Sequence, residues 1–205
     1  MIQEWFVQCI STASDITVAL SAIAVAMIGF FGLQQWKREL RGKTQFDLAR
    51  RIAQQAFEFR ERFHAARSSF TYIGQSAERA KAENETLEVA EVMDEWYARS
   101  KLMEELNKTA RILHETTWEG SLLLDPEITD LVKPLENAFS ELLVSFHVYF
   151  RAQLRNARRP NRTSGNEDCL EEHCDRVYGN PNDSIAKGVD TAVDALAQRV
   201  KRYIR

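Results

Sequence analysis

Three side chains that could bind a metal ion lie close together near the C-terminal end of the sequence. They are Cys169, His173 and Cys174, and thiolate and imidazole groups are the usual ligands of zinc. A structural zinc site needs a fourth ligand, and no second CxxC or HxxxH pair provides one. That ligand would have to come from His147 or from another copy of the chain. We therefore expect these residues to have no ligand role, and we expect no metal ion and no cofactor.

Two histidine patterns resemble metal-binding motifs but lack the partners that those motifs require. His114 and Glu115 begin like a zincin helix, but Trp118 stands where the second histidine is needed. Glu61 and His64 have the ExxH spacing of di-iron bundles, which use two such pairs and two further carboxylates. Only one pair is present, so we expect neither a zinc protease nor a di-iron centre.

Arginine and histidine on one helix, at a suitable spacing, would indicate the signature of HEPN-type helical ribonucleases. Arg60 and His64 are too close together for that signature, and Arg111 and His114 are closer still. The sequence also has no glycine-rich phosphate loop, GxSxG elbow or Cys-His pairing. We therefore expect no catalytic residue and no enzymatic activity. A HEPN-like ribonuclease or metalloenzyme is the least favoured alternative.

The composition is that of a folded, helical chain. A length of 205 residues suits an anchor plus one compact domain, and only 8 Gly and 4 Pro interrupt helix formation. The formal net charge of -3 argues against bulk electrostatic binding of nucleic acid, which is therefore the least favoured partner. Three cysteines, Cys9, Cys169 and Cys174, form an odd set without framework spacing, so a disulfide scaffold is not expected.

The first element that the sequence predicts is an apolar stretch near the N-terminus. From Ile16 to Trp36 no residue is charged, and at 1.5 Å per residue this helix would be about 30 Å long, the thickness of bilayer hydrocarbon. Glu4 and Asp15 precede it where a cleavable signal peptide would be basic. We therefore predict a transmembrane helix over 15–36 after a short external segment, 1–14. A buried soluble helix is the alternative.

The basic residues lie only on the C-terminal side of this stretch, which predicts a cytoplasmic domain and an external N-terminus. Tryptophans that suit the membrane interface, Trp5 and Trp36, mark both ends. The basic residues nearest the span should contact anionic lipid headgroups. They are Lys37, Arg38, Arg41 and Lys43.

Small residues recur on one side of the predicted span, which would let a second helix approach closely. They are Ala19, Ala22, Ala26 and Gly29, and they predict a homo-oligomer interface in the membrane. Thr17 and Ser21 lie four residues apart on one face and could form a polar lining if several copies enclosed a path.

In the rest of the chain, apolar residues recur at helical spacing. This pattern predicts an all-α domain built as a bundle of about four helices. Gly42 interrupts the helix that leaves the membrane, and Thr44 with Asp47 has capping-box spacing, so the helix either bends here or runs through. The bundle should occupy 37–154, with helices near 44–67 and 86–117 and a third starting at 125. Residues 155–183 read as a polar, flexible loop, and 184–205 as an amphipathic helix that docks on the bundle.

The run from Trp36 to Arg51, WKRELRGKTQFDLARR, resembles the junction in a group of uncharacterised bacterial single-pass membrane proteins with a helical cytoplasmic domain. By architecture alone the chain is also similar to the membrane accessory protein of type VI-B CRISPR systems, an oligomeric, pore-like antiphage component. The resemblance implies an anchored helical layout in a bacterial inner membrane and no reaction.

We therefore expect a non-enzymatic, membrane-anchored helical protein that forms oligomers and acts in membrane perturbation or antiphage defence. The alternative is a membrane-tethered adaptor or signalling protein, which would recruit a cytoplasmic protein partner.

Overall fold

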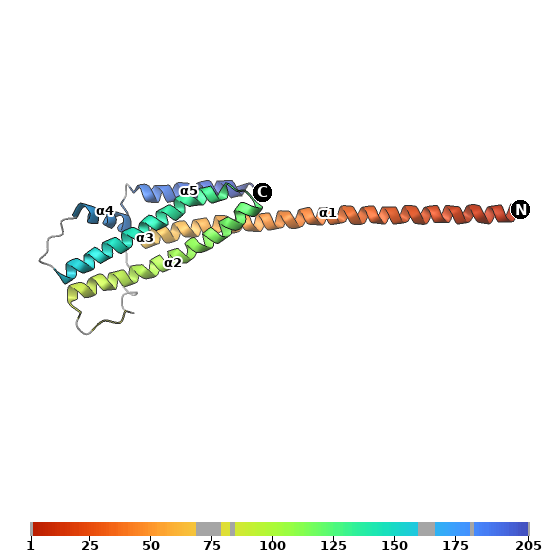
Figure 1. Cartoon of the computed structure of the whole chain (residues 1–205). Coiled ribbons are helices and arrows are strands. Elements are labelled where there is room, and N and C mark those ends of the chain that lie inside the picture. The colour runs from red at the N-terminus through yellow and green to blue at the C-terminus, as the bar shows by residue number, and fades with distance from the viewer. Residues whose placement is uncertain (1, 69–78, 83–84, 160–166, 181–182, 205) are drawn as a thin grey trace. The chain divides into compact units, whose positions relative to one another are not determined.

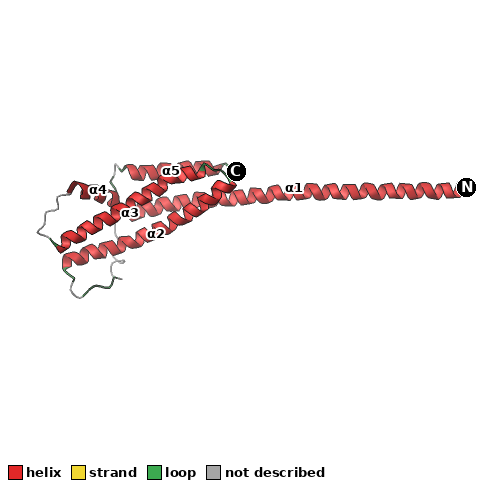
Figure 2. Cartoon of the chain, viewed as in Figure 1, coloured by secondary structure: helices red, strands yellow, loops and turns green. Residues whose placement is uncertain are grey.

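The computed structural model describes residues 2–68, 79–82, 85–159, 167–180 and 183–204. Side chains are described throughout these ranges except at 2–19 and 167–169. Every regular element in the described ranges is a helix, and none of these residues forms a strand (Figure 2). The predicted all-α class is confirmed for this part of the chain.

The chain divides into two compact units, Met1–Phe46 and Asp47–Arg205. Helix α1, Ile2–Arg67, contributes residues to both. It is continuous through Gly42, and Thr44 donates its hydroxyl to the carbonyl of Leu40 at 3.0 Å instead of capping a new helix. Of the two alternatives at Gly42, the helix therefore runs through.

None of the helices is both long enough and apolar enough to cross a membrane within the part of the chain that is described. The transmembrane helix predicted over 15–36 has no support from this result. Its first residues, 15–19, lie outside the described side chains.

The second unit is built on an apolar stripe of α1. Its buried residues recur every three or four positions, which places them on one helix face. They are Leu48, Ala49, Ile52, Ala56, Phe59, Phe63 and Ala66. The buried faces of α2 (Leu87–Leu123), α3 (Ile128–Arg158) and α5 (Ser184–Lys201) complete the core. Helix α3 packs against α2 and α5 and also against α4, Glu167–Tyr178 (Figure 1).

Helix α2 begins where the sequence predicts, because the hydroxyl of Thr86 accepts a hydrogen bond from the backbone N–H of Val89. It continues to Leu123, beyond the end predicted at Thr117. No proline interrupts the helix before Pro126, so the last turns can form.

The inner face of α3 has helical spacing. Leu135, Ala138, Leu142, Phe146 and Phe150 are buried, and Leu131, Phe139 and Tyr149 pack against the core. Pro134 lies inside this helix, near its start.

Helix α5 also matches its prediction. Asp183 caps it by accepting a hydrogen bond from the N–H of Ile185 at 2.9 Å. Its apolar side packs on the core as predicted, with Val189, Ala192, Val193, Leu196 and Val200 buried.

The loop predicted over 155–183 is wrong in part, because it contains the last residues of α3 and the whole of α4. Leu170, Cys174 and Val177 lie on one side of α4 at helical spacing, and Val177 is buried. Gly179 ends the helix with φ at +72°, and its N–H donates to the carbonyl of Asp175 at 2.9 Å. The helical spacing of apolar residues in α4 can be seen in the sequence only when Cys174 is counted as apolar.

Gly120 of α2 lies in close contact with α1. A Cβ atom at this position would lie 2.5 Å from Cδ1 of Ile52, which is fully buried. We expect Gly120→Val to lower the free energy of unfolding by about 1–3 kcal/mol, because the core would have to expand. Urea unfolding of the purified chain, followed by circular dichroism, measures this.

The matched control is Gly188→Ala in α5, where an added Cβ meets nothing within 4 Å. This change should raise stability by up to about 1 kcal/mol through helix propensity. Equal stability of the Gly120→Val variant and the wild type would contradict the close contact.

Candidate functional site

The described part of α1 in the first unit carries apolar side chains around its whole circumference. Large ones, none less than 51% exposed, are Leu20, Ile23, Val25, Met27, Ile28, Phe30, Phe31, Leu33 and Trp36. Since helix positions turn by about 100° per residue, this set covers every side of the helix. Keeping such a surface in water is unfavourable, by about 25 cal/mol per Å² of apolar area.

The small-residue side of this helix is open. Ala22, Ala26 and Gly29 are exposed, and a Cβ added at Gly29 would meet nothing within 4 Å. Ala19 and Thr17 lie outside the described side chains, while Ser21 is described and exposed. The four basic residues that follow in α1 are all exposed: Lys37, Arg38, Arg41 and Lys43. The predicted interface, polar lining and lipid contacts stay predictions.

The predicted metal-binding candidates do not converge. Nδ1 of His173 lies 3.1 Å from the hydroxyl oxygen of Ser145, and Cys174 is half-buried with a free thiol. His147 is about 200° around α3 from Ser145, which puts it on the opposite side of that helix. The side chain of Cys169 lies outside the described residues. Across the described residues, no group of three or more His, Cys, Asp and Glu could hold a metal ion.

The other candidate histidines pair with carboxylates of neighbouring helices. Nε2 of His64 lies 3.1 Å from Oδ1 of Asp190, and Nδ1 of His114 lies 2.6 Å from Oε1 of Glu136. All four side chains are at least 45% exposed. Surface pairs of this kind contribute at most about 1 kcal/mol each, so they join α1 to α5 and α2 to α3 only weakly.

Arg99 is the most buried charged residue among those described, only 1% exposed. Its guanidinium donates to the carbonyls of Ala66 at 3.2 Å and Ser68 at 3.1 Å, which fixes the end of α1. It also bonds Glu95 at 3.2 Å and stacks 4.1 Å above the ring of Tyr178. A buried charge is tolerated only when it is paired and hydrogen-bonded, and these three hydrogen bonds and the stacking contact with Tyr178 provide that environment.

Tyr178 connects this cluster to α4. Its hydroxyl donates to Oε1 of Glu95 at 2.6 Å. Burial and this hydrogen bond to a carboxylate raise the pKa of Tyr178 far above its ordinary value. Burial likewise raises the pKa of Tyr149, whose ring lies 5.4 Å from that of Tyr178. Both groups therefore remain protonated hydrogen-bond donors and are unsuited to act as bases at neutral pH.

Arg67 makes a second buried contact at the same end of the unit. It donates to the carbonyls of Arg176 at 2.7 Å and Asp175 at 3.3 Å in α4, and it forms an ion pair with Asp183. Since Asp183 also caps α5, one guanidinium connects α1, α4 and α5. This cluster of buried arginines is structural.

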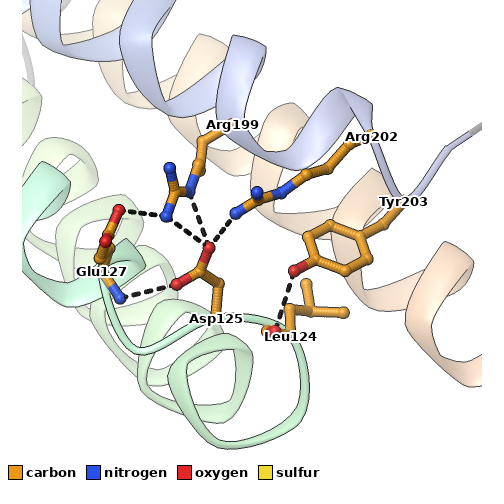
Figure 3. Close-up of polar contacts among 6 residues, drawn as sticks. All are labelled: Leu124, Asp125, Glu127, Arg199, Arg202 and Tyr203. Carbon is orange, nitrogen blue, oxygen red and sulfur yellow. Dashed lines mark hydrogen bonds and ion pairs between the residues drawn. The ribbon is translucent and has the colours of Figure 1, made fainter.

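A third polar cluster lies at the other end of the unit, in the turn between α2 and α3 (Figure 3). Asp125 accepts a hydrogen bond from Arg199 at 2.7 Å and another from Arg202, both from the end of α5. Arg199 also pairs with Glu127, and the hydroxyl of Tyr203 donates to the carbonyl of Leu124 at 2.9 Å. The carboxylate of Asp125 also accepts a hydrogen bond from the N–H of Glu127 at 3.1 Å. The third helix, predicted to start at 125, begins at Ile128 with Glu127 at its N-cap, and Glu127 makes no side-chain cap hydrogen bond.

A fourth polar cluster joins the chain before α2 to that helix. Arg79 donates to both carboxylate oxygens of Glu85, at 3.0 and 2.8 Å, and to Asp94 at 2.6 Å. These hydrogen bonds hold the pKa values of Glu85 and Asp94 below their ordinary range. Their stabilising effect is therefore complete at neutral pH and is lost as the pH falls through those lowered pKa values.

An open groove of about 280 Å³ lies between α2 and α3. Its lining is mostly apolar, with one histidine and one arginine: Val92, Met93, Trp96, His147, Phe150, Arg151 and Leu154. Among these lining residues, none is a nucleophile paired with a base.

We expect Arg99→Met to lower the free energy of unfolding by about 3 kcal/mol, because the buried carbonyls that it satisfies would lose their partner. Arg111→Met is the control, since Arg111 is 75% exposed and its pair with Glu115 is 3.8 Å long. That change should cost under about 0.5 kcal/mol. Urea unfolding of both variants tests this, and equal losses would argue against a structural role for Arg99.

Comparisons of this chain with protein-family models, with curated proteins and with solved structures find no match. Its function therefore has to be argued from the side chains and contacts described above.

Proposed function

We propose that the chain is a single-pass membrane protein that tethers a non-enzymatic helical bundle to the inner face of a bacterial inner membrane. Residues 15–36 cross the bilayer, the N-terminus is outside, and the second unit is cytoplasmic. In this role the bundle works by binding a protein partner at the membrane, as an adaptor.

One observation carries this proposal. Large apolar side chains surround α1 from Leu20 to Trp36, and no side chain of this stretch is charged. A helix that is apolar on all sides is stable only when it is buried in lipid or protein. With the preceding uncharged residues from Ile16, the length suits a bilayer, and the cations from Lys37 onward set its orientation.

The bundle favours an adaptor for a second reason. The groove between α2 and α3 combines half-buried apolar side chains and the buried Phe150 with two exposed polar side chains, Arg151 and His147. Such a site can take an apolar anchor residue of a partner and an adjoining acidic group.

We expect the full chain to stay in the membrane pellet after carbonate washing and ultracentrifugation. Replacing both Ile23 and Ile28 by Asp should move it to the supernatant, because each carboxylate in the middle of the span costs about 3 kcal/mol. The distribution is measured by immunoblotting of pellet and supernatant.

The control places the same two charges on the bundle, at Leu87 and Val144, which are exposed. This variant should remain in the pellet. Full release of the unmodified chain by carbonate would refute the anchor.

Self-association in the membrane is a second candidate function, favoured by the open small-residue side of α1 at Ala22, Ala26 and Gly29. In this case several copies would perturb the membrane, as an antiphage protein could.

We expect Ala26→Leu with Gly29→Leu to reduce crosslinked oligomers in membranes several-fold, because the larger side chains would keep the helices apart. Ala24→Leu, on the opposite side of the helix, is the control and should leave the yield unchanged. Crosslinking that yields only monomer for the wild type would exclude this candidate.

Dye release from vesicles separates the two functions. An adaptor leaves vesicles tight, whereas a membrane-perturbing oligomer releases the dye.

A further inference from the structure

We propose that the α2–α3 end of the second unit docks on the bilayer surface through an apolar patch formed by Trp118, Leu122 and Leu123. The occupant of this patch is a membrane that contains anionic lipid. The inference rests on the proposed anchor and adds a second, peripheral contact with the same membrane.

The patch is apolar and open. Trp118 is 62% exposed and Leu122 is 66% exposed, and they lie four residues apart on one face of α2. Leu123 extends the surface at the end of the helix and is 47% exposed. Tryptophan is the side chain that most favours the membrane interface, because its ring is apolar and its N–H can bond to water or headgroups.

The patch lies at the end of the second unit where the chain enters it. Glu119 pairs with Arg51 at 3.4 Å, and Gly120 packs against Ile52. These contacts place the last turns of α2 beside the first turns that α1 contributes to this unit, just after Asp47.

The tether is short enough to hold this end near lipid. Residues 37–46 separate Trp36, the last residue of the proposed span, from Asp47. Their length is about 15 Å as helix and at most about 35 Å when extended. The tether therefore keeps the patch within its own reach of the headgroups, which raises the effective concentration of the patch at the membrane surface.

Basic side chains lie beside the patch and can face an anionic surface, although the exposed Glu115 and Glu119 lie on the same turns of α2 as Trp118. Asp125 is paired with both Arg199 and Arg202, and Glu127 is paired with Arg199. Arg202 remains 48% exposed, and Arg51 remains 57% exposed despite its pair with Glu119. Lys201 is exposed in the same last turn of α5 (Figure 3 shows this turn at Arg199 and Arg202). Basic side chains beside anionic lipid contribute about 1 kcal/mol each.

The ion cluster also prepares the patch for binding. Arg199, Arg202 and Tyr203 fix the turn that follows Leu123, so the end of α2 is held in place before it meets lipid. Little conformational freedom would then be lost on docking.

The test uses the full chain reconstituted in vesicles of phosphatidylcholine and phosphatidylglycerol that carry a lipid-linked quencher at a shallow depth. A fluorophore is attached at Leu122→Cys or at Leu87→Cys, after the native cysteines have been replaced by Ser or Ala. Leu87 is the matched control, because it is a leucine at the opposite end of the same helix and is 74% exposed. Circular dichroism checks that both labelled chains remain folded.

We expect several-fold stronger quenching by lipid at position 122 than at position 87, and weaker quenching at 122 in vesicles without phosphatidylglycerol. Equal, weak quenching at both positions, in chains that resist carbonate washing, would overturn docking and leave the anchor intact. A blue-shifted fluorophore at 122 without lipid quenching would mean that another copy of the chain covers the patch, which also overturns it. Chains that do not stay with the vesicles at all would overturn both the anchor and the docking.

Discussion

Burial of one face of α1, from Leu48 to Ala66, is the constraint on which the second unit depends. Its side chains lie in the same core as those of α2, α3 and α5. The contact between Gly120 and Ile52 then fixes how closely α2 can approach this face. Because the stripe has a period of three or four residues, it determines which side of each neighbouring helix is covered and which remains at the surface.

Polar contacts determine the two ends of the unit. Arg67 and Arg99 hold backbone carbonyls at one end, and Asp125 gathers two arginines of α5 at the other. An unpaired buried polar group costs more free energy than a formed hydrogen bond contributes. Because another register between the helices would leave such groups unpaired, the clusters disfavour it. The contacts between helices are enough to explain why charged side chains are buried here.

Periodicity in the sequence predicts the long helices well, since the faces of α3 and α5 follow directly from Leu, Val and Phe spacing. It misses α4, which is short and polar and whose apolar side depends on Cys174. It also misses the burial of Arg99, because charged residues are normally exposed. The groups that accept hydrogen bonds from Arg99 are mostly backbone carbonyls, and these cannot be identified from the sequence. His64, His114 and His173 were singled out by residue type, whereas their partners Asp190, Glu136 and Ser145 come from distant segments.

The position at which the core begins has a practical consequence. Leu48 is the first buried residue among those whose side chains are described, so the core of the second unit draws none of its buried side chains from Leu20–Asp47. A recombinant fragment that starts shortly before Asp47 would keep every described core residue while omitting the exposed apolar stretch of α1. Such a fragment is the natural starting point for crystallisation or NMR without detergent.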